Sequence, residues 1–111
     1  MAEEVKSRNY TLRTESGGWL AQIVITSDGM FASVTDYGNF SFAWRSFGGY
    51  DFRHFLIGLS TDYFSTKMAT GFSYIAHSKA IDRGALRFAE KVLPPLQAVL
   101  KKEIEENVRW D

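Results

Sequence analysis

Four cationic side chains recur at a fixed interval in the C-terminal third of the chain. They are Lys79, Arg83, Arg87 and Lys91. If this segment is helical, a spacing of four residues places all four side chains on one face. Clustered lysine and arginine on one helix face could bind phosphate groups or the carboxylates of an acidic partner. This row is the main candidate binding site in the sequence.

The charge distribution bears on three interpretations of the row. Residues 79–102 carry six basic and two acidic side chains (+4), whereas residues 103–111 carry one basic and four acidic (−3). The whole chain has 13 basic and 13 acidic residues, while nucleic-acid-binding domains usually carry a clear basic excess. An acidic protein partner is therefore favoured over nucleic acid, which stays the alternative. The simplest interpretation is a solvated helix face on which Asp82 and Glu90 pair with the cations.

Asp51 and His54 are the one pair whose spacing could serve proton transfer. A carboxylate three residues before a histidine on a helix could orient the imidazole as a general base. The alternative is that Asp51 caps the helix and His54 is half exposed. The chain has no cysteine, and neither histidine belongs to a metal-binding motif such as His-x-x-x-His. We therefore expect no enzymatic activity, no metal and no cofactor.

Aromatic residues are abundant, with nine Phe, five Tyr and three Trp. Three of them, Tyr37, Phe47 and Tyr50, lie in or beside glycine-containing turns. Exposed rings of this kind could anchor a protein partner, because aromatic residues dominate interface energetics. The alternative is that these rings fold back over the edge of the sheet. Both interpretations remain open at the level of the sequence.

The N-terminal half has the period-two alternation of β-strands, interrupted by short turns. Short connections require antiparallel neighbours, so these strands form a meander. Phe40, Phe42 and Trp44 alternate with small or polar residues, which places three large rings on one face, the expected core side. The expected strands span about residues 10–14, 19–26, 30–36 and 40–45.

The C-terminal half has the spacing of helices that could cover this sheet. We expect helices over about residues 51–59, 61–69 and 78–107. Pro94 and Pro95 should kink or break the last one, although the apolar stripe keeps its phase beyond them. The predicted fold is therefore an α+β domain: a four-stranded antiparallel β-meander over about residues 10–45 with helices packed on one face. At 111 residues it should be one domain, with residues 1–8 flexible.

Other features concern location and self-association. A chain without cysteine suits a reducing compartment, and neither a signal peptide nor a membrane-spanning run is visible, so we expect a cytoplasmic protein with no membrane contact. The sheet edges and the apolar residues after Pro95 could also bury against a second copy, so a homodimer is a further expectation. These apolar residues are Val99, Ile104, Val108 and Trp110.

Several segments together resemble small accessory proteins of phages and prophages. They are Gly18-Trp19-Leu20, Ser27-Asp28-Gly29-Met30-Phe31-Ala32, Asp36-Tyr37-Gly38-Asn39-Phe40, Ala43-Trp44-Arg45-Ser46 and Asp51-Phe52-Arg53. The resemblance spans residues 10 to about 75 and includes no catalytic residue. It implies a protein that binds a host protein stoichiometrically in the bacterial cytosol. Anti-CRISPR proteins, which inhibit CRISPR-Cas defence, belong to this size class, so the resemblance also implies inhibition of a bacterial defence system.

Overall fold

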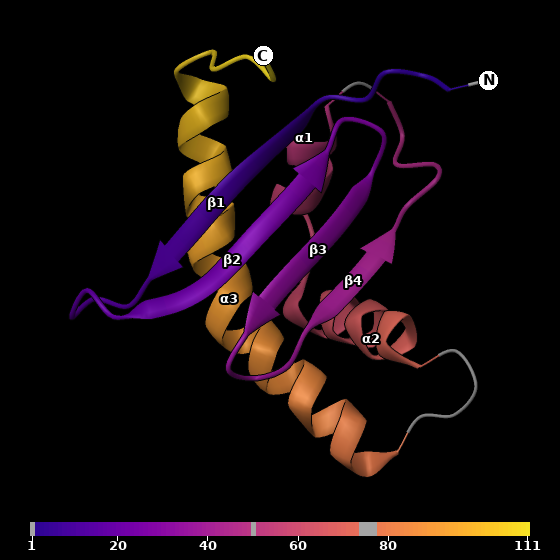
Figure 1. Ribbon diagram of the computed structural model, residues 1–111, viewed down its shortest axis with the longest axis vertical. Helices are drawn as coiled ribbons and strands as arrows, with labels where there is room; N and C mark the ends of the chain where they lie inside the picture. The colour runs from indigo at the N-terminus through magenta and orange to yellow at the C-terminus, as the bar shows by residue number, and fades with distance from the viewer. Residues whose placement is uncertain (1, 50, 74–77) are drawn as a thin grey trace.

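A computed structural model describes residues 2–49, 51–73 and 78–111. It has a four-stranded sheet followed by helices, as the sequence predicted (Figure 1). The strands are β1 (Ser7–Arg13), β2 (Trp19–Thr26), β3 (Met30–Thr35) and β4 (Phe40–Ala43), and the helices are α1 (Phe52–Ile57), α2 (Thr61–Phe72) and α3 (Lys79–Glu105).

The sheet is an antiparallel meander in which each strand pairs with the next along the chain, in the order β1-β2-β3-β4. Tyr10 pairs with Ile23, and Ile23 pairs in turn with Ser33. β1 begins at Ser7, so the last two residues of the segment expected to be flexible, Ser7 and Arg8, belong to a strand. Both residues are held by pairing with β2, and the Arg8 side chain bonds to the C-terminal end of α3.

The core lies between one face of the sheet and the helices, which are drawn behind the strands in Figure 1. Side chains alternate along each strand, so that Ile23 and Phe31 are fully buried while Gln22 and Val34 are exposed. Phe40 and Trp44 point into the core as expected, and Phe42 is half-buried against it. The covered face is therefore the one that the alternation predicted.

Each helix begins at a side-chain cap. The carboxylate of Asp51 accepts a hydrogen bond from the Arg53 N–H at 2.9 Å, and the hydroxyls of Ser60 and Ser78 play the same part for α2 and α3. These bonds satisfy backbone donors that have no partner within the helix. The Asp51 cap confirms one of the two roles that the sequence suggested for this residue.

Helix α2 extends three residues further than the expected 61–69 because Gly71 does not end it. Gly71 keeps a helical conformation and lies directly against the backbone of Ser41 in β4. A Cβ atom at this position would overlap the Ser41 carbonyl oxygen. The glycine therefore permits close contact between α2 and β4, which is a packing role and not a terminating one.

Helix α3 is one continuous helix of 27 residues that contains Pro94 and Pro95. Its axis changes direction near the middle of the helix (Figure 1). Pro94 is exposed, so the break in the hydrogen-bond ladder faces solvent, while Val92 and Leu96 stay buried on the core side. The persistent apolar stripe explains why the helix bends here and does not end. Among the described residues, no helix is long and apolar enough to cross a membrane.

Candidate functional site

The four predicted cations lie together on the exposed face of the N-terminal half of α3. Lys79, Arg83, Arg87 and Lys91 are all exposed, and the opposite face buries Phe88 against the sheet. In the part of the chain that the structure describes, none of the four forms an ion pair. The expected pairing with acidic neighbours on the helix is therefore not seen there. We call these four residues the cationic row.

A hollow of about 440 Å³ lies beside the two central members of the row. It is open to solvent and is lined by α3 alone: Arg83, Gly84, Leu86, Arg87 and Glu90. Leu86 is 38% exposed, as several other large apolar side chains of this protein are. A Cβ atom at Gly84 would meet no atom within 4 Å, so the missing side chain leaves open space. The α3 hollow is therefore bordered by two cations, one acidic side chain and one exposed leucine.

Two of the three predicted loop aromatics, Tyr37 and Phe47, pack against the rest of the protein. Tyr37 and Phe47 are half-buried and pack against the core, and the Phe47 ring lies 5.1 Å from that of Phe52, centroid to centroid. The interpretation that the rings fold back over the sheet edge fits both residues. Tyr50, the third predicted binding ring, lies outside the described residues.

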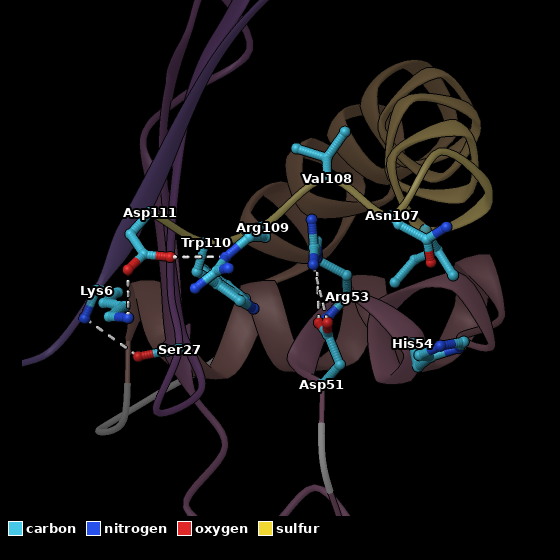
Figure 2. A pocket seen from close by; sticks show the side chains of 11 residues that line it. Lys6, Ser27, Asp51, Arg53, His54, Asn107, Val108, Arg109, Trp110 and Asp111 are labelled. Atoms are coloured by element: carbon cyan, nitrogen blue, oxygen red, sulfur yellow. Dashed lines mark hydrogen bonds and ion pairs between the residues drawn. The ribbon is translucent and has the colours of Figure 1, made fainter.

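Asp51 and His54 line a common surface cavity of about 480 Å³, together with residues 107–111 (Figure 2). His54 is exposed, and the Asp51 carboxylate faces Arg53. Both carboxylate oxygens are held by the guanidinium, at 3.1 Å from Nε and 2.9 Å from Nη2. In this geometry Asp51 serves as a helix cap and ion-pair partner, so the absence of catalysis remains the prediction for this pair.

A cluster of polar side chains that the sequence analysis missed joins β1, α1 and the end of α3. At its centre, Glu103 accepts hydrogen bonds from the Tyr10 hydroxyl (2.7 Å), Arg8 Nη2 (2.8 Å) and Arg53 Nη1 (3.2 Å). Arg53 is only 4% exposed and also pairs with Asp51. We call Arg8, Tyr10, Asp51, Arg53 and Glu103 the Glu103 cluster. Its acidic and basic members neutralise one another. Their hydrogen bonds and ion pairs hold β1, α1 and the end of α3 together.

The residues after α3 fold back over this cluster. Asn107 adopts the left-handed conformation (φ 56°), which asparagine tolerates better than most residues and which reverses the chain. The Arg53 guanidinium then lies 5.2 Å from the centre of the Trp110 ring. Lys6 pairs with Asp111 at 2.8 Å, as Figure 2 shows. Trp110 therefore docks on its own chain.

The cluster shifts the protonation equilibria of its members. Burial alone would raise the pKa of Glu103, but hydrogen bonds from Tyr10, Arg8 and Arg53 outweigh it and hold the pKa below its ordinary value. Burial and the bond to Glu103 together raise the pKa of the Tyr10 hydroxyl to about 12. At neutral pH, Glu103 is thus a carboxylate and Tyr10 a neutral donor.

Tyr10 leads to a prediction for alkaline pH. Its pKa in the folded state is about 12, against an ordinary value of 10.0, so the folded state favours the neutral hydroxyl. The stabilisation is therefore fully present below about pH 10 and is lost as the pH rises towards 12. Urea unfolding across this range should show a decline in stability that is shallower in Tyr10→Phe. An identical decline in both proteins would contradict the assignment.

The described residues contain no cluster of three or more side chains of the metal-binding types.

Fold and surface together define a small α+β domain that displays a cationic helix face. A protein-family model described as a phage family, Phage_phiTE_072, matches residues 2–83. Because the match covers well over half of the chain, the protein belongs to that phage family. No curated protein and no solved structure gives a significant match. The matched region includes the sheet, α1, α2 and the first residues of α3, among them Lys79 and Arg83.

Proposed function

We propose that this phage protein binds stoichiometrically to an acidic surface of a host protein in the bacterial cytosol, and that the cationic row makes the contact. The observation that carries the proposal is that four exposed cations share one helix face without an ion pair among the described residues. A surface of this kind attracts acidic groups and loses little of its own pairing when it binds them.

Two features of the same face favour a protein over nucleic acid. The α3 hollow contains an acidic side chain, Glu90, and an exposed apolar one, Leu86, neither of which assists contact with phosphates. The chain as a whole also carries no net charge. Nucleic acid remains the alternative, supported by the row itself, because evenly spaced lysine and arginine can follow a phosphate backbone.

A charge-reversal pair tests the proposal. Arg83→Glu/Arg87→Glu should abolish capture of a stoichiometric partner from host lysate, because two central attractions become repulsions. Lys101→Glu/Lys102→Glu is the matched control: it changes net charge equally, on the same helix, at exposed residues outside the row. Equal recovery of the partner by the two variants would contradict the proposal.

Binding to labelled DNA at several salt concentrations tests the alternative. If the row binds duplex phosphates, each cation removed should reduce the log–log salt slope by about 0.9. If the protein binds DNA in a salt-sensitive way and Arg83→Glu/Arg87→Glu abolishes this binding, the partner of the row is nucleic acid and not a protein.

The finer form of the proposal is that the bound host protein belongs to a defence system such as CRISPR-Cas. Cells with an active system and expressing the wild-type protein should then allow a targeted phage to form plaques, whereas cells expressing Arg83→Glu/Arg87→Glu should not. Equal plaque numbers in both strains would exclude this form and leave stoichiometric binding to be judged by the capture experiment.

A further inference from the structure

We propose that the uncovered face of the sheet joins two copies of this chain, face to face, in a homodimer. This face is turned away from the helices, and we call it the open face. The helices are drawn behind the strands in Figure 1, and no other described segment is drawn in front of them. The cationic row lies on the exposed side of α3, so the proposal concerns a second surface and goes beyond the proposed function.

The centre of the open face carries no charge. Strand pairing aligns its side chains in rows across the sheet, with Val24 beside Ala32 and Gln22 beside Val34. Arg13, the last residue of β1, is the one charged residue that the strands turn to this face. The chain as a whole is 23% charged, so a surface that only faced water would be expected to carry more charge. The residues of the open face are Ser7, Asn9, Thr11, Arg13, Trp19, Gln22, Val24, Thr26, Met30, Ala32, Val34, Ser41 and Ala43.

Three large apolar side chains of this face are exposed. Trp19, Met30 and Val34 are 40%, 39% and 52% exposed, and Val24 and Ala32 between the strand ends are half-buried. Covering these side chains would remove apolar surface from water. Depletion of charge together with exposed apolar and aromatic side chains is the composition of the central part of protein–protein interfaces.

Charges of both signs surround this centre. Asp28 and Asp36 lie in the turns at the two ends of β3, and both are exposed. Arg13 ends β1 and Arg45 follows β4, and these two are exposed as well. A charged rim around an uncharged centre is the usual arrangement of an interface.

A second copy of the chain fits the open face better than the partners considered for the cationic row. Nucleic acid and acidic host surfaces bind to cations, which the centre of the face lacks. In a two-fold dimer the same patch of both copies meets, so central charges would be placed close to like charges. The uncharged centre avoids this repulsion, and its small and medium side chains can interdigitate as two sheets pack about 10 Å apart.

The size of the open face predicts a weak dimer. Four strands spaced about 4.8 Å apart, each roughly six residues long, cover roughly 20 Å by 20 Å, or about 400 Å² on each copy. A standard interface takes about 800 Å² from each partner, and smaller interfaces belong to weak and transient complexes. We therefore expect association that depends on protein concentration.

The sequence led us to expect a homodimer through the sheet edges and the apolar residues after Pro95. Two of those residues, Val99 and Trp110, pack against the core of their own chain. Helix α2 lies against the edge strand β4 at Gly71. These contacts make the open face the better surface for a second copy.

Sedimentation equilibrium of the full-length protein tests the proposal. Between about 1 μM and about 1 mM protein, the average mass should rise from that of one chain towards that of two. Gln22→Glu and Val34→Glu each place a carboxylate in the centre of the face. Each should raise the dissociation constant at least about tenfold, because two like charges meet in the dimer.

Gln22→Glu is nearly isosteric and keeps an acceptor for the Thr11 hydroxyl, which donates to Gln22 Oε1 at 3.0 Å. It should therefore fold like the wild type even if Val34→Glu does not, and melting curves check both variants. Leu86→Glu is the matched control, because it adds the same charge at an exposed apolar residue of α3. It should leave the dissociation constant unchanged.

A wild-type protein that stays monomeric up to about 1 mM would overturn the inference, and so would a host protein that occupies the open face of that monomer. A dimer that survives both glutamate variants, or that Leu86→Glu weakens equally, would show that the contact lies elsewhere and overturn it too. Arg83→Glu/Arg87→Glu should lose capture of the host partner and keep the dimer, so the proposed function and the dimer are judged separately.

Discussion

Replacement of Gly71 by alanine should strongly destabilise the fold. The added methyl group would overlap the carbonyl oxygen of Ser41 and lie 2.9 Å from its carbonyl carbon, both of which belong to a strand backbone that cannot move aside locally. Overpacking typically costs about 1–3 kcal/mol, and a contact with backbone belongs at the upper end of this range. We expect a loss of about 3 kcal/mol, which corresponds to a fall in Tm of roughly 10–20 °C for a domain of this size.

Gly84→Ala is the matched control, because it makes the same chemical change within a helix. Its Cβ would meet nothing within 4 Å, so only helix propensity changes, and the variant should gain up to about 1 kcal/mol. Thermal and urea unfolding of the two variants should therefore shift in opposite directions. Shifts of the same sign would show that α2 does not rest on β4 through Gly71. This contact matters because it holds α2 against β4, the last strand of the meander.

Removal of Arg53 should have the second large effect. Arg53 is 4% exposed and donates to both Asp51 and Glu103, so Arg53→Met leaves two partly buried carboxylates without their shared cation. Breaking a buried ion pair from one side costs about 3–5 kcal/mol. Asp51 and Glu103 retain some contact with water, at 21% and 13% exposure, so we expect a smaller loss, about 2–4 kcal/mol.

The exposed pair between Lys6 and Asp111 provides the control. Both side chains are about half exposed, so Lys6→Met should leave the free energy of unfolding almost unchanged. Urea unfolding measures both variants, and a double-mutant cycle of Arg53→Met with Glu103→Gln measures the coupling within the Glu103 cluster. Strictly additive losses would mean that the two residues do not stabilise the fold through their mutual contact.

The family match covers only the first two members of the cationic row, Lys79 and Arg83. The family match ends at residue 83, within the row, so Arg87, Lys91 and the α3 hollow from Gly84 onwards lie beyond it. The charge-reversal variant therefore changes one residue inside the matched region, Arg83, and one beyond it, Arg87.

Most of the fold could be predicted from the local periodicity of the sequence. Alternation over residues 40–44 predicted that Phe40 and Trp44 face the core, because a strand places every second residue on the same face. The helical stripe likewise predicted that α3 keeps its phase past Pro94 and Pro95. The cationic row was found for the same reason: its members are neighbours on one helix, and their spacing is visible without any knowledge of the fold.

The Glu103 cluster and the role of Gly71 were decided by tertiary structure alone. Glu103 contacts Arg8, Tyr10 and Arg53, which lie 95, 93 and 50 residues away along the chain, so no local pattern links them. A glycine near the end of a helical pattern looks like a stop signal, and only the position of Ser41 shows that it is a point of contact. Spacing along the chain thus determined the strands, the helices and the exposed charge, while contacts between distant segments required the folded structure because they depend on where the elements meet in space.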